Sequence, residues 1–199
     1  FIGFSYIDAF YGQDYVVYAL IYDLFGSFLL VVSLGVFVIN WGNGETVKLK
    51  TIFKSVIIFP PIIMFFVTVI LKLVPIPNFA MNTAQAVGAT LVPLAMIAIG
   101  MKLEIKNIFY KFKTVSLALL LKMILMPIGI AILFSIFYTL EDTWSKVTIL
   151  EVAMPPMTTA VILAIKGGLD ERFAINALVI GVLASLASVT GFYFILGNF

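Results

Sequence analysis

Residues Glu151–Val161 read EVAMPPMTTAV and interrupt a long apolar segment, residues 144–165, near its centre. Proline removes a backbone donor and clashes with the preceding helical turn, so two adjacent prolines are poorly tolerated inside a regular helix. The pair Pro155–Pro156 therefore predicts a break with local unwinding. The break has a carboxylate one turn before it, on Glu151, and two hydroxyl groups after it, on Thr158 and Thr159.

The composition around this stretch is that of an integral membrane protein. Of its 199 residues, 63% are hydrophobic and only 11% are charged, whereas soluble domains carry about 25% charged residues. The lysines lie between apolar blocks and the net charge is +2, so nucleic-acid binding has no support. The sequence has no cysteine, no histidine and no P-loop, which excludes thiol and histidine chemistry, zinc fingers and ATP-driven transport by this chain alone. We expect no enzymatic activity and no cofactor.

Six segments meet the length of about 20 mostly apolar residues that a membrane helix requires. They are residues 15–39, 52–73, 79–101, 114–138, 144–165 and 173–196. A shorter piece, Phe1–Tyr11, precedes them and reads as the second half of another span, so we expect the chain to be part of a longer protein. The connections are too short for separate domains. The sequence thus predicts one all-α integral membrane domain.

The cations predict how this domain is oriented. Nine lysines and arginines lie in the loops at 40–54, 101–113 and 166–172, whereas the opposite side has only Lys72 and Lys146. Cytoplasmic loops carry an excess of such residues, so the side with nine should be cytoplasmic. We therefore expect a multi-pass protein of the cell membrane, a bacterial inner membrane, with an extracytoplasmic C-terminus.

Three ionisable residues lie well inside the predicted spans: Asp23, Lys122 and Glu151. A charge near mid-membrane costs about 2.5–3.5 kcal/mol on insertion scales, so such a side chain normally faces a partner or water. Asp23 lies about 12 Å deep at helical rise and is too short to reach the surface. Lys122 can snorkel, and Glu151 has a route toward the headgroups. We predict ion or proton coupling at these residues, most strongly at Asp23, and the alternative is a structural contact.

Uncharged polar and small residues occur in two other spans. Asn82, in AMNTAQ, is a candidate substrate ligand, although the small residues around it favour packing against a neighbouring helix. Small residues permit close packing of membrane helices and recur in the last span. These are Gly181, Ser185, Ser188 and Gly191.

The two ends of the chain share one layout. Each end has a half-span, then a connection with a glycine and an acid, and then a long span. This order occurs in FIGFSYIDAFYGQDYVVYALIYDLFG and again in AMPPMTTAVILAIKGGLDERFAINALVIG. The first connection is predicted outside and the second inside. Equivalent units of opposite orientation indicate inverted-topology repeats, an arrangement typical of secondary transporters.

Several of these stretches resemble one family of membrane transporters. One helix of that family carries a Gly, then Pro-Leu, and then a Gly and a Leu at its end, and it resembles PNFAMNTAQAVGATLVPLAMIAIGMKL. The next helix of the family resembles LALLLKMILMPIGIAIL. AMPPMTTAVILAIKGGLDERFAINALVIGVLASLAS resembles its proline-broken helix and final span, and FIGFSYIDAFYG is similar to the matching broken helix of the first repeat. In this order they resemble the auxin efflux carrier family, which includes PIN-FORMED carriers and bacterial organic-acid permeases.

The resemblance implies ten helices in two inverted repeats, of which residues 1–39 end the first repeat, 40–51 form a cytoplasmic linker and 52–199 form the second. It implies that the fourth and ninth helices are broken and cross at mid-membrane, where an anionic substrate binds. The ninth-helix crossover corresponds to Pro155–Pro156. The fourth-helix crossover corresponds to Ile2–Ser5, which makes Gly3 and Ser5 candidate ligands, although Ser5 replaces the proline of the family pattern.

These observations predict a secondary transporter that carries a small organic anion, such as a carboxylate, by alternating access. A broken helix exposes backbone N–H groups and the positive end of its dipole, which attract a carboxylate. The chain is also compatible with a homodimer in the lipid bilayer. The alternatives are a sodium-coupled carrier of the bile-acid transporter type and a membrane scaffold or receptor that transports nothing.

Overall fold

The computed structural model describes residues 2–42, 60–71, 73, 77–90, 93–94, 97, 101, 109–137 and 140–197, and within these ranges the chain is helical with no strand. The helices of the first half are α1 (Ile2–Tyr11), α2 (Val16–Ile21), α3 (Val36–Gly42), α5 (Pro60–Leu71) and α6 (Asn78–Ala89). Those of the second half are α8 (Phe112–Leu120), α9 (Met126–Phe137), α10 (Thr143–Val152), α11 (Thr158–Lys166) and α12 (Glu171–Leu196).

Three continuous helices of the described chain are long and apolar enough to cross a membrane. They are Gln13–Ile39, which contains α2 and most of α3, Phe112–Phe137, which contains α8 and α9, and Glu171–Leu196, which is α12. The helices predicted at 15–39, 114–138 and 173–196 are therefore confirmed to within two residues at each end. The predicted spans at 52–73 and 79–101 extend beyond the described residues, which cover α5 and α6 within them.

The predicted break is confirmed. Helix α10 ends at Val152, α11 begins at Thr158, and the residues between them are not helical. Pro155 and Pro156 lie in this connection, where neither has to donate a backbone hydrogen bond. The short segment predicted before residue 12 is helical and forms α1.

Two glycines reverse the chain at corresponding places. Gly12 (φ 94°) follows α1 and leads into the Gln13–Ile39 helix, and Gly168 (φ 75°) follows α11 and leads into α12. Positive φ is open to glycine without steric cost, so these turns explain why each short helix folds back beside a long one.

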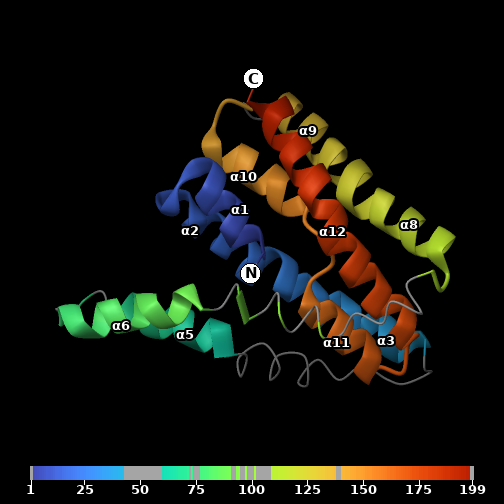
Figure 1. Ribbon diagram of the computed structural model, residues 1–199, viewed down its shortest axis with the longest axis horizontal. Coiled ribbons are helices and arrows are strands. Elements are labelled where there is room, and N and C mark those ends of the chain that lie inside the picture. Colours follow the sequence, from blue (N-terminus) through green and yellow to red (C-terminus); the bar gives the residue numbers. More distant parts are fainter. Residues whose placement is uncertain are drawn as a thin grey trace.

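Helix α10 occupies the centre of the main helical body, with α1 and α2 on one side and α9 and α12 on the other (Figure 1). Its inward residues belong to a cluster completed by side chains from these neighbours. The fully buried members of that cluster are Ile7, Ala19, Val147, Ile149, Leu150, Ala153 and Val189. Helix α11 packs farther along, where Leu163 lies against Gly35 of the long N-terminal helix.

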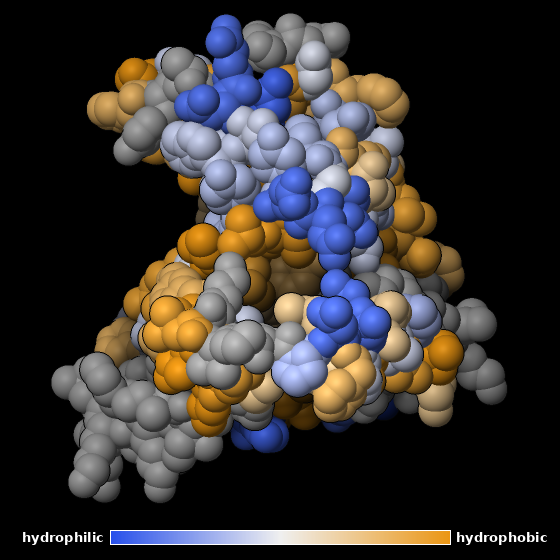
Figure 2. All heavy atoms as spheres, turned by 90° about the vertical axis from the view of Figure 1, so that its left-hand side faces the viewer, coloured by the Kyte–Doolittle hydropathy of each residue, from blue (hydrophilic) through white to orange (hydrophobic). Residues whose placement is uncertain are grey.

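The outer surface of this body is rich in apolar side chains. Large hydrophobic residues are exposed along every long helix, including Leu34, Leu117 and Leu186. Figure 2 shows orange, hydrophobic side chains over much of one face, with the hydrophilic residues gathered in patches. Such a surface would be costly in water and suits a lipid environment.

Candidate functional site

The carbonyl end of α10 at the break is capped by a lysine from another helix. Lys122 Nζ donates a hydrogen bond of 2.7 Å to the backbone oxygen of Val152, the last residue of α10. The last carbonyls of a helix lack partners within that helix and carry its negative dipole end, so an ammonium group is well placed there. Lys122 therefore points into the protein at the break and does not snorkel to the membrane surface.

Glu151, one residue earlier, is turned toward α1. Its side chain is 4% exposed, and Oε1 has no hydrogen-bond partner among the described residues. A Cβ atom added to Gly3 would lie 2.6 Å from Glu151 Oε2 and 2.8 Å from its Cδ atom, so the carboxylate lies directly against the α1 backbone. The expectation that Glu151 reaches toward the headgroups is wrong, because depth along a helix does not reveal which neighbour the side chain faces.

Asp23 belongs to the same region. It interacts electrostatically with Lys122, and Glu151 interacts with both of them. The structure thus brings together the three ionisable residues that the sequence places inside spans, from three different helices. Asp23 and Lys122 also lie in segments with widened helical turns, Tyr22–Phe28 and Leu121–Leu125. Such π-type turns are rare and frequently mark functional sites.

On the far side of the break, both prolines pack against α12. A Cβ atom added to Gly181 would lie 3.0 Å from Pro155 and 3.2 Å from Pro156, so only glycine lets α12 approach this closely. Helix α11 then begins at Thr158, which is exposed, and Thr159, which is half-buried. No side chain caps this amino end, so its positive dipole is available to a ligand.

The remaining predicted ligands divide into two groups. Ser5 lies half-buried on α1, two residues after Gly3, and so belongs to the helix that meets Glu151. Asn82 is exposed on α6, which lies well apart from the break in Figure 1, and it does not join the site. Among the described residues, no three Asp or Glu side chains gather as a metal ion would require.

Outside the spans, one polar cluster ties two loops together. Asp170 accepts hydrogen bonds from Lys111 Nζ at 2.7 Å, from the backbone N–H of Phe173 at 3.0 Å and from the Tyr110 hydroxyl at 3.1 Å. The Lys111 and Phe173 bonds lower the pKa of the Asp170 carboxyl to about 2, and the bond to Asp170 raises the pKa of Lys111. The loops before α8 and α12, both predicted cytoplasmic, therefore lie at the same end of the molecule.

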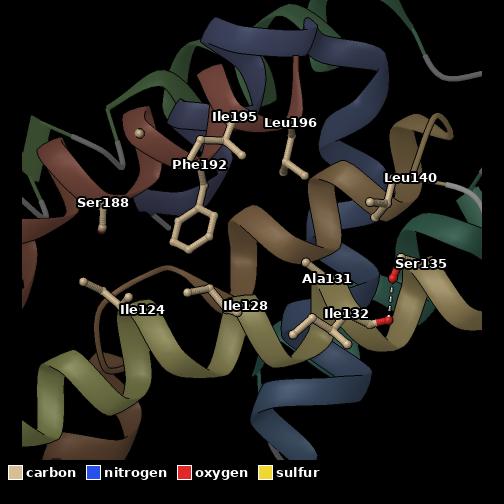
Figure 3. A pocket seen from close by; sticks show the side chains of 11 residues that line it. Ile124, Ile128, Ala131, Ile132, Ser135, Leu140, Ser188, Phe192, Ile195 and Leu196 are labelled. Atoms are coloured by element: carbon tan, nitrogen blue, oxygen red, sulfur yellow. Dashed lines mark hydrogen bonds between the residues drawn. The ribbon is translucent and has the colours of Figure 1, made fainter. Parts of the chain in front are cut away.

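A groove of about 570 Å³ lies elsewhere, between α9 and the second half of α12. Figure 3 shows Phe192 of α12 directed toward Ile124 and Ile128 on the opposite helix. Ser135 and Ser188 are its polar side chains, and Ser135 already donates to the backbone oxygen of Ile132 at 2.7 Å. This groove offers an anion no charged partner, so the break remains the candidate site.

Comparison with known proteins gives consistent matches. A family model described as membrane transport protein matches residues 1–193. A protein of Methanothermobacter thermautotrophicus named as an uncharacterized transporter is 28% identical over 192 residues, 95% of this chain and 61% of the relative. Another uncharacterized transporter, from Methanocaldococcus jannaschii, is 26% identical over 204 aligned positions, 100% of this chain and 65% of the relative. The chain thus spans less than two thirds of either relative, and no solved structure matches it.

Proposed function

Because the chain belongs to the auxin efflux carrier family of membrane transport proteins, we propose that the full-length protein carries a small organic anion across the membrane by alternating access. The anion, a carboxylate, binds at the break between α10 and α11. The observation that carries this proposal is that no side chain caps the amino end of α11. The carbonyl end of α10, on the other side of the break, accepts a hydrogen bond from Lys122.

The chemistry of the break favours an anion over a neutral or cationic ligand. The first backbone N–H groups of α11 have no partners within that helix, and the dipole of a helix concentrates positive charge at this end. Thr158 and Thr159 add hydroxyl donors beside these N–H groups. Helix amino ends bind phosphate and carboxylate groups in many proteins for this combined reason.

Alternating access is supported by the paired layout of the chain. Helix α1, Gly12 and the following long helix form one unit, and α11, Gly168 and α12 form a second with the same order of short helix, glycine turn and long helix. Inverted repeats of this kind place a substrate site where their broken helices meet. We assign residues 1–39 to the end of the first repeat and 52–199 to the second, with the loops around Lys111 and Asp170 in the cytoplasm.

Counterflow in liposomes containing the full-length protein tests this function. We use radiolabelled lactate, succinate and citrate as carboxylate probes, and the neutral diamide of succinate as the matched control. We expect saturable exchange of at least one carboxylate, no exchange of the diamide, and weaker exchange for Thr158→Val than for Thr158→Ser, which keeps the hydroxyl. Equal exchange of succinate and its diamide would overturn the proposal.

A further inference from the structure

The ionisable side chains near the break do not balance in charge. Asp23 and Glu151 are acids, Lys122 is the side-chain base with which both interact, and these three side chains sum to one negative charge when all are ionised. An organic anion at the adjacent break would add another. Uncompensated charge is costly inside a membrane, so a positive charge has to accompany the anion.

The surroundings of Glu151 indicate where that positive charge binds. Oε1 is buried and has no hydrogen-bond partner among the described residues, although a buried polar atom normally has one. Oε1 receives no hydrogen bond from Lys122, whose ammonium group donates to the Val152 carbonyl. Oε1 of Glu151 is therefore a buried carboxylate oxygen without a donor among the described residues.

The space around this carboxylate selects the kind of cation. Hard metal ions in proteins gather about six oxygen ligands, which requires room and further acceptors. Here the α1 backbone at Gly3 lies so close that an added Cβ would be 2.6 Å from Oε2. No group of three Asp or Glu side chains that could hold a metal ion occurs in the described part of the chain. A proton needs one oxygen and no additional space.

Ionisable side chains from two neighbouring helices interact with Glu151. From the Gln13–Ile39 helix these are Asp23 and Tyr22, and from the α8–α9 helix it is Lys122. The amino group that begins the chain also interacts with Glu151, and α1 places its backbone at Gly3 directly against the carboxylate.

We propose that Glu151 binds one proton together with each transported anion, which makes the protein a proton–anion symporter. This inference rests on the proposed function. The proton adds to the Glu151 carboxylate from one aqueous side while the anion occupies the break, and both leave to the other side after the conformational change. No covalent bond other than the O–H bond forms or breaks.

Two measurements on the full-length protein separate this inference from the transport function. The first is infrared spectroscopy of the protein in lipid across a pH titration. We expect the carbonyl band of a buried protonated carboxylic acid, absent in Glu151→Gln and retained in Asp8→Asn, which alters an exposed acid on α1. A band that persists in Glu151→Gln, or no such band in the wild type, overturns the inference even if transport is observed.

The second measurement is accumulation of the best-transported carboxylate probe in liposomes. A gradient of one pH unit should drive about tenfold accumulation of a monoanion carried with one proton through electroneutral transport. A sodium gradient without a pH gradient should drive none, and Glu151→Gln should lose the response to pH. Accumulation driven by sodium, or a pH response that survives Glu151→Gln, overturns the inference, whereas no flux of any probe in the wild type counts against the proposed function instead.

Discussion

The ammonium group of Lys122 donates a 2.7 Å hydrogen bond to the backbone carbonyl of Val152, thirty residues later in the chain. This bond joins the α8–α9 helix to the carbonyl end of α10 at the point where the broken helix stops. It also holds a positive charge beside the two acids of the site, Asp23 and Glu151. One side chain thus stabilises both the break and the charges around it.

Replacing Lys122 should therefore damage the protein in two ways. Lys122→Met removes the cap on Val152 and the cation beside the two acids, and we expect a loss of about 1.5–3 kcal/mol, the usual range for a hydrogen bond from a charged group. Thermal unfolding of the full-length protein in detergent, together with carboxylate exchange, measures this. Lys113→Met, at an exposed position near the start of α8, is the matched control and should change neither.

The contact between Gly3 and Glu151 predicts a compensating pair of substitutions. Gly3→Ala should cost about 1–3 kcal/mol, the usual range for overpacking, and should lower exchange because the new methyl group displaces the carboxylate. Shortening the acid with Glu151→Asp in the same protein should restore part of the stability. A double-mutant cycle measures this coupling, and strict additivity would show that the two residues do not touch.

Gly129→Ala provides the control for that cycle. An added Cβ at Gly129 meets nothing within 4 Å, and this glycine lies inside α9. Alanine should there be neutral or stabilising by about 0.5–1 kcal/mol, because glycine is a poor helix former.

Two glycines of α12 should respond differently to the same change. Gly181→Ala would push a methyl group to 3.0 Å from Pro155 and 3.1 Å from Leu119, whereas Gly191→Ala would meet no atom within 4 Å. We expect Gly181→Ala to lower carboxylate exchange severalfold by shifting the break, and Gly191→Ala to leave it unchanged. Equal effects at both positions would mean that α12 does not position the prolines.

The loop cluster around Asp170 predicts a dependence on pH. The pKa of this carboxyl is lowered to about 2, while an unfolded aspartate titrates near about 3.9, so its stabilising contribution is complete above about pH 4 and is lost as the pH falls through about 2. Asp170→Ser keeps an acceptor for the Phe173 N–H and removes the charge. Thermal unfolding should find this variant less stable than wild type at pH 5, with the difference vanishing toward pH 2.

The helices and the break could be predicted from the sequence because each has a local cause. Apolar runs of helical length predicted the three long helices, and the adjacent prolines predicted the connection between α10 and α11. The depth and short side chain of Asp23 predicted that it stays inside the span, and the structure holds it half-buried beside Lys122 and Glu151.

The tertiary contacts of the site could not be predicted in the same way. The partner of Lys122 is a backbone carbonyl, which no sequence pattern singles out, and the direction of Glu151 depends on how α1 packs against α10. Asn82 was grouped with the site on the basis of its polarity, but α6 holds it at an exposed position away from the break. A polar residue inside an apolar segment was therefore a candidate for the site, and only the packing of the helices showed which candidates lie near the break.

The break between α10 and α11 is the proposed binding site of the transported anion. The most direct test of this proposal is carboxylate exchange by the full-length protein in liposomes after Pro155, Pro156 and Thr158 are all replaced by alanine, with insertion and folding verified and Ser135→Ala on the exposed face of α9 as control. We predict that the triple variant loses exchange of every carboxylate that the wild type carries, while the control retains it. Exchange by the triple variant at the wild-type rate would show that the anion binds elsewhere.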